Sequence, residues 1–233
     1  MTLADAANLH TFGEAFRFIG DHPSFLATKA FEQLQLSAAA LGLALLVALP
    51  LGIILGHLHR GSALAIGASI VGRALPSLVL IATFLTLLGI GFLNNMFALA
   101  VLATGPILTN AFDGVDGVDR DAVEAARGMG MTGTQILGRI ELPLAIPLLF
   151  TGIRVAAVTV VATAPIAAIA GGGGLGDIIV NQASYRLSGV LAASICVMLL
   201  SAAVFVLLLG VQVAVTPRGL RRTSLGDDLT RKE

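Results

Sequence analysis

Residues 74–112 have the sequence ALPSLVLIATFLTLLGIGFLNNMFALAVLATGPILTNAF, which contains no charged side chain. A helix needs about 20 apolar residues to cross a hydrocarbon layer about 30 Å thick, so this run is long enough for two spans. We therefore expect the chain to fold back at the Gly-Ile-Gly sequence of residues 89–91. The first of the two helices is predicted to start near Ser62 and to bend at Pro76.

Further apolar runs lie on both sides of this one, at residues 33–56, 144–169 and 187–215. Of the 233 residues, 56% are hydrophobic and only 12% are charged, whereas soluble domains carry about 25% charged residues. A surface with so few charges suits a membrane better than water. The sequence therefore predicts an all-α membrane protein with about five transmembrane helices.

The domain organisation follows from these spans. Residues 33–215 are expected to form the membrane domain, and the polar residues 216–233 to form a tail. Residues 1–32 are predicted to be a periplasmic or interfacial segment, in which apolar residues at helical spacing indicate a helix before Pro23.

The positions of Arg and Lys predict how the chain is oriented. Most of them fall in the loop after the first span, in the long polar loop 113–143 and in the tail. Cytoplasmic loops of membrane proteins are enriched in these residues. We therefore expect a multi-pass membrane protein with its N-terminus outside and its C-terminus in the cytoplasm.

The loop 113–143 is the only long hydrophilic interruption between spans, and it resembles two short helices joined by a turn. Asp119 or Asp121 can cap the first helix, and Gly130 can supply the left-handed residue that ends it.

The second helix of this loop is predicted to start at a capping box formed by Thr132 and Gln135, and to stop at Pro143. On physical grounds alone, the loop is either a docking surface or a solvated connector.

The same loop carries a specific motif: E-A-A, three residues, G, nine residues, and I-x-L-P. This pattern resembles the EAA motif of type I ABC importer permeases, and every fixed position is filled. The matching residues are Glu124, Ala125, Ala126, Gly130, Ile140, Leu142 and Pro143.

The resemblance implies a fold and a role. The fold would be that of a type I importer permease, and the loop would be its cytoplasmic coupling helix, which sits in a groove of the ATP-binding subunit. The implied partners are ABC ATPase subunits, a second permease of the same or similar sequence, membrane lipid, and a periplasmic or lipid-anchored solute-binding protein.

Four other motifs extend the resemblance over roughly residues 33–215. They are RALPS at 73–77, GIGF at 89–92, GIR at 152–154 and GGGLGD at 172–177. Together they resemble the permeases for quaternary-amine osmoprotectants such as glycine betaine, choline, carnitine and proline betaine. Methionine and taurine permeases share parts of these motifs, so an amino-acid or sulfonate importer is the alternative.

Candidate pathway or gate residues lie within and beside the spans. Arg73 and Arg154 each lie well inside an apolar run, where a charge is costly; they either line the pathway or snorkel towards the headgroups. Gly173, Gly174 and Asp177 follow the fourth span, where they form either an outer gate or a flexible loop. Pro76 can kink the second span.

Several functions lack support in the sequence. There is no Gly-Lys-Ser/Thr sequence for a phosphate-binding loop, so no catalytic residue is predicted and ATP with Mg²⁺ is expected on a partner subunit. A formal net charge of zero gives no electrostatic support for nucleic acid binding. We predict no cofactor in this chain and no metal site, since His57 and His59 have no acidic neighbour in the sequence. An ion-coupled transporter would favour acidic residues within the spans, and these runs have none.

Overall fold

The computed structural model describes residues 3–61, 67 and 76–216. The predicted helix start near Ser62 and the candidate residue Arg73 lie outside these residues.

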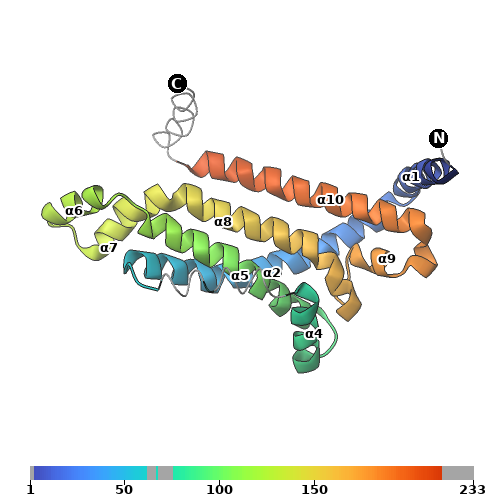
Figure 1. The fold of residues 1–233 in the computed structure, drawn as a ribbon, viewed down its shortest axis with the longest axis horizontal. Coiled ribbons are helices and arrows are strands. Elements are labelled where there is room, and N and C mark those ends of the chain that lie inside the picture. The colour runs from blue at the N-terminus through green and yellow to red at the C-terminus, as the bar shows by residue number, and fades with distance from the viewer. Residues whose placement is uncertain (1–2, 62–66, 68–75, 217–233) are drawn as a thin grey trace, which may run out of the picture.

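The described residues are helical apart from short connections (Figure 1). The helices are α1 (Leu3–Asp21), α2 (Pro23–His57), α4 (Ser77–Leu88), α5 (Phe92–Asp116), α6 (Arg120–Gly128), α7 (Gly133–Ile136), the π-helical segment η1 (Leu137–Glu141), α8 (Leu142–Thr163), the 3₁₀ segment η2 (Ala164–Ala170), α9 (Gly176–Val180) and α10 (Gln182–Val215).

Four of the described helical stretches are long and apolar enough to cross a membrane: α2, α5, the stretch Gly133–Ala170 and α10. The 12-residue α4 is apolar but shorter than a span. Figure 1 shows the long helices side by side, with α6 and α7 at one end and α1 and α9 at the other. We call these ends of the bundle the loop end and the glycine end.

Two predicted boundaries can be compared with the structure. The predicted turn at 89–91 is confirmed, because α4 ends at Leu88 and α5 begins at Phe92. Gly89 (φ +79°) and Gly91 (φ +144°) adopt backbone angles that side chains rarely allow. The first long helix begins earlier than its apolar run, at Pro23. Proline suits the first turn of a helix because the missing N–H is not needed there.

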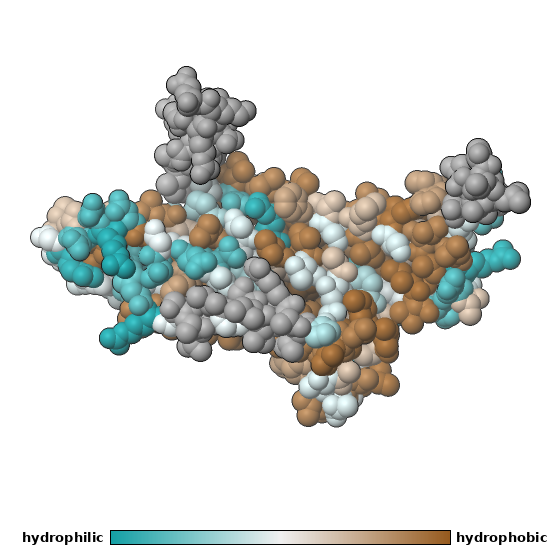
Figure 2. Space-filling view, viewed as in Figure 1, coloured by the Kyte–Doolittle hydropathy of each residue, from teal (hydrophilic) through white to brown (hydrophobic). Residues whose placement is uncertain are grey.

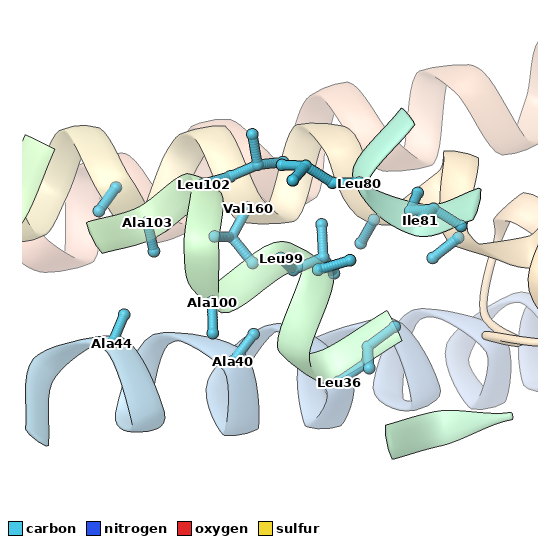
Figure 3. Close-up of a cluster of buried hydrophobic side chains, with 14 of the residues drawn as sticks. Leu36, Ala40, Ala44, Leu80, Ile81, Leu99, Ala100, Leu102, Ala103 and Val160 are labelled. Atoms are coloured by element: carbon cyan, nitrogen blue, oxygen red, sulfur yellow. The ribbon is translucent and has the colours of Figure 1, made fainter. Parts of the chain in front are cut away.

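The core is a seam between α2 and α5, two helices that run in the same direction. Small buried residues recur every fourth position along α2: Ala40, Ala44, Ala48, Gly52 and Gly56. A Cβ atom added to Gly52 would lie 2.6 Å from Ala111 Cβ, so the two backbones meet there directly. Figure 3 shows Ala40 and Ala44 facing Ala100 and Ala103 across this seam. Small residues permit such close packing in membranes.

The predicted helix stop at Pro143 is wrong. Helical structure continues from α7 through η1 into α8, and Pro143 occupies the first turn of α8. The π-helical turn explains this, because its wider ring moves the preceding carbonyls away from the proline ring and leaves no hydrogen bond that needs the missing N–H.

Hydrophilic residues gather at the loop end in Figure 2, over α6 and α7, whereas hydrophobic residues dominate the surface around α4 and α9. Large exposed hydrophobic side chains such as Leu46, Leu87 and Leu199 belong to the long helices and to α4. An exposed surface of this kind fits a lipid environment.

Candidate functional site

The loop end is built around a small hydrophobic cluster inside the loop that joins α5 to α8. Asp119 caps α6, because its carboxylate accepts a hydrogen bond from the Asp121 backbone N–H at 3.0 Å. Val123 and Ala126 face inward and pack with Val118 and Ile136. The loop therefore has a core of its own and is an ordered two-helix unit.

The reversal between α6 and α7 depends on Gly130. Its φ of +83° lies in the left-handed region, where a side chain would be strained. Thr132 and Gln135 then form the predicted capping box, in which Gln135 Oε1 accepts a hydrogen bond from the Thr132 N–H at 2.9 Å.

The motif residues divide into an exposed and a packed group. Glu124 and Ala125 are exposed on α6, whereas Ala126 is buried, and Ile140 packs against the loop core. Glu124 also lines an open pocket of about 210 Å³. The other lining residues are His59, Val118, Arg120, Val123 and Arg127. The outer face of α6 thus combines a charged rim with small side chains.

Two histidines at the end of α2 contact carboxylates. His57 Nδ1 lies 2.6 Å from Glu141 Oε2, and His59 Nδ1 lies 2.7 Å from Asp116 Oδ1. Although the sequence shows no acidic neighbour for either histidine, the fold supplies one to each. Among the described residues, no group of three or more His, Cys, Asp and Glu side chains could hold a metal ion.

The glycine end contains a break in the helix that follows α8. The 3₁₀ segment η2 ends at Gly171 (φ +75°), and the chain then passes through Gly173 (φ +71°) and Gly174 (φ +78°) before α9. Three residues in the left-handed region within four positions explain why glycine is required here.

Charged side chains from α2 hold this glycine segment. Lys29 Nζ lies 2.9 Å from Glu32 Oε2 and 2.8 Å from Asp177 Oδ2. The same Glu32 oxygen accepts a hydrogen bond from the Gly174 N–H at 3.0 Å. The candidate residues Gly174 and Asp177 are therefore brought together, next to Gly173, by two residues that the sequence analysis did not single out.

Two uncharged polar side chains donate to backbone carbonyls near the two ends of η2. Gln33 Nε2 donates to the Val161 carbonyl at 2.9 Å, and Asn95 Nδ2 donates to the Ala170 carbonyl at 3.1 Å. The sequence offers a reason to single these residues out, since Lys29 and Glu32 stand just before the charge-free run that begins at Gln33. What the sequence did not reveal is the segment to which they bind.

Arg154 lies away from both ends, between α8 and α10. Its Nη1 donates to Gln212 Oε1 at 2.7 Å, and its guanidinium lies 5.1 Å from the centroid of the Phe205 ring. Gln212 Nε2 in turn donates to the Pro147 carbonyl at 3.1 Å. A cavity of about 200 Å³ adjoins Arg154 and Phe205.

The candidate residue Pro76 precedes α4 with extended backbone, so the predicted bend falls at a helix start.

Comparisons with known proteins agree on one family. The family model described as "Binding-protein-dependent transport system inner membrane component" matches residues 48–221. The chain is 34% identical to the glycine betaine/carnitine/choline transport system permease protein OpuCB of Bacillus subtilis, over 88% of this chain and 94% of that protein. It is 36% identical to the carnitine transport permease protein OpuCB of Listeria monocytogenes, with coverage of 91% and 97%.

A more distant similarity concerns the fold. A chain in an inward-facing structure of the MetNI methionine ABC transporter superposes with a TM-score of 0.71 at 21% identity, covering 84% of this chain and 99% of that one. A third relative by sequence is the osmoprotectant import permease protein OsmW of Salmonella typhimurium, 32% identical over 89% of this chain and all of that one. The chain belongs to the inner membrane components of binding-protein-dependent transport systems, that is, to the permease subunits of ABC importers, whose ATPase is a separate subunit.

Proposed function

We propose that this permease imports quaternary-amine osmoprotectants such as glycine betaine, choline, carnitine or proline betaine. The observation that carries the proposal is that relatives at 32–36% identity, matched over nearly their whole length, are named for glycine betaine, carnitine, choline or osmoprotectant transport. The motifs at 73–77 and 172–177 point to the same group of permeases.

Uptake in a deletion strain tests the substrate class. We expect loss of the gene to lower the uptake of labelled glycine betaine, choline or carnitine under salt stress, and the restored gene to recover it. If instead methionine or taurine uptake depended on the gene while uptake of the quaternary amines did not, the chain would be an amino-acid or sulfonate importer permease.

The proposed assembly places the loop end in the cytoplasm and the N-terminus outside, with five spans within residues 33–215. Two such permeases pair in the membrane, two ATPase subunits with ATP and Mg²⁺ bind at the loop end, and a solute-binding protein docks at the glycine end. ATP binding closes the ATPases and moves the loops, which opens the cavity between the permeases to the outside. Hydrolysis then returns the cavity to the cytoplasm.

The loop between α5 and α8 is proposed as the coupling element that contacts the ATPase. Its own hydrophobic cluster makes it rigid enough to transmit a displacement, and its outer face offers the small side chain of Ala125 beside the charged Glu124. Gly130 sets the angle between its two helices.

Two substitutions test this coupling role. Glu124→Lys reverses the charge on the docking face, and Gly130→Asp places a side chain at a φ of +83°. We expect both variants to insert in the membrane and support ATP hydrolysis by the assembled transporter, while solute uptake falls at least about tenfold. Unchanged uptake in both variants would contradict the assignment.

The glycine end is proposed as the outer gate, formed by Gly173, Gly174 and Asp177. Its support is the ion-pair and hydrogen-bond network from α2, which can open without unfolding a helix. Arg73, Pro76 and Arg154 are proposed to line the pathway or shape it. For Arg154, the support is that its guanidinium has two contacts on α10, a hydrogen bond to Gln212 Oε1 and the Phe205 ring.

A further inference from the structure

The hydrogen bond between His57 and Glu141 joins two helical segments that are far apart in the sequence. His57 is the last residue of α2, and Glu141 is the last residue of the π-helical turn before α8. Their Nδ1 and Oε2 atoms are 2.6 Å apart across 84 positions of sequence. The other side of the ring faces α7, since a Cβ atom at Gly133 would lie 3.4 Å from His57 Nε2.

Glu141 depends on this contact because it is buried, with 1% of its surface exposed. A buried carboxylate without hydrogen bonds is strongly disfavoured, and an ionised one can only accept them. The hydrogen bond with His57 Nδ1 therefore supplies the partner that the buried Glu141 Oε2 requires. Because Glu141 is buried, the contact belongs to the packed interior of the loop end and not to its surface.

The pair lies at one of the two points where the coupling loop joins the long helices. We call these points the roots of the loop: one is at the end of α5 and the other is at η1. His59, two residues beyond α2, contacts the α5 root at Asp116, and His57, the last residue of α2, contacts the η1 root at Glu141. The first contact is more than a third exposed at both side chains, whereas Glu141 is sealed from solvent. The second contact is therefore the one that can hold its geometry against water.

We propose that His57 is a positioning residue. The end of α2 packs directly on the α5 root, where a Cβ atom at Gly56 would lie 2.8 Å from Val115 Cβ, and the bond from His57 to Glu141 fastens the η1 root to the same helix, so that the loop moves as one rigid lever. This inference rests on the proposed role of the loop in contacting the ATPase. Without the tie, a displacement of α6 and α7 would be absorbed by bending at η1, whose π-helical turn is less tightly wound than an α-helix. With it, the displacement passes to α2 and α8, and through α2 to the network at Lys29.

Three variants separate the positioning role from simple loss of a buried partner. His57→Leu leaves Glu141 unpaired in the interior and can fail to fold. His57→Leu combined with Glu141→Leu removes both polar groups, which is often tolerated when the pair is replaced by apolar side chains. His57→Asn keeps a hydrogen-bonding amide near the position of Nδ1. Leu58→Ala, an exposed neighbour of His57, is the surface control.

The variants are compared in the complete transporter, with its ATPase and solute-binding protein, in proteoliposomes. We measure the uptake of labelled glycine betaine per ATP hydrolysed. The double leucine variant is expected to assemble and hydrolyse ATP, but to lose at least about fivefold of the uptake per ATP. His57→Asn and Leu58→Ala should stay within about twofold of the wild type. A double leucine variant within twofold of the wild type, or His57→Asn as defective as it, would overturn the proposal.

A second readout does not depend on the solute. In a background with Cys196→Ala, spin labels at Thr28→Cys and Val180→Cys report the distance across the glycine end, before and after trapping the ATPase with ATP and vanadate. We expect a distance change in the wild-type background and none in the double leucine variant; a change that persists there overturns the proposal. If wild-type vesicles take up no quaternary amine, the proposed substrate is wrong, and the distance measurement alone decides the role of His57.

Discussion

Lys29 is one of two lysines in the sequence, and its ammonium group lies between two carboxylates at the glycine end. The Lys29 and Asp177 side chains are 20% and 37% exposed, so solvent screens their attraction and the pair adds less than about 1 kcal/mol to stability. The ion pair instead fixes the position of α9 against α2. Glu32 Oε2, the other oxygen that contacts Lys29, accepts a hydrogen bond from the Gly174 N–H.

A charge swap tests this pair at the level of single residues. Lys29→Asp places three carboxylates together, and their repulsion should separate α9 from α2. We expect uptake to fall at least about tenfold with little loss of folded protein, and Lys29→Asp with Asp177→Lys to recover it to within about threefold. Uptake assays and membrane protein yield provide the measurements. Wild-type uptake by Lys29→Asp alone would show that the contact has no part in gating.

At the scale of elements, the seam between α2 and α5 is a line of very close backbone packing. Gly52 and Gly56 face Ala111 and Val115 so closely that a Cβ atom would lie 2.6 Å and 2.8 Å from their Cβ atoms. Neither helix can shift to make room without opening a gap elsewhere along the stripe of small residues.

A matched pair of glycines on α2 tests the seam. Gly52→Leu should force the helices apart and reduce the yield and thermal stability of the protein in detergent, by about 1–3 kcal/mol or more as overpacking usually does. Gly42→Leu is the control, since a Cβ atom there has no neighbour within 4 Å. Equal stability of the two variants would show that the seam is looser than its geometry indicates.

The elements also show what could be read from the sequence. Runs without charge located the long helices, and the spacing of Glu124, Gly130 and Pro143 located the two-helix loop between α5 and α8, because both signals are local along the chain. The pairing of His57 with Glu141 could not be read, since it depends on how α2 and α8 pack. The continuation past Pro143 was also missed, because a π-helical turn leaves no clear mark in composition.

At the scale of the whole molecule, α2 is longer than a membrane requires. Its 35 residues span about 52 Å, whereas the hydrocarbon layer is about 30 Å thick. Because the apolar run starts at residue 33, much of the excess lies at the glycine end. Thr28 should therefore stand outside the hydrocarbon layer, and Met129, 76% exposed at the other end, should stand on the opposite side.

Cysteine labelling tests this orientation. In a Cys196→Ala background, a membrane-impermeant maleimide should label Thr28→Cys in intact spheroplasts and Met129→Cys only after permeabilisation. The parent Cys196→Ala protein provides the unlabelled control. The reverse pattern would invert the proposed topology and place the coupling loop on the wrong side for an ATPase.

The close contact of α2 with α5 also determines where a solute cannot go. Two backbones that touch through Ala40, Ala44, Ala48, Gly52 and Gly56 leave a seal that admits neither water nor lipid along that line. In the paired assembly proposed above, the polar solute crosses along another face of the bundle, one that lipid would cover in an isolated subunit. The second permease of that assembly would shield this face and turn it into the wall of a conduit, so that half of the route is supplied by the partner.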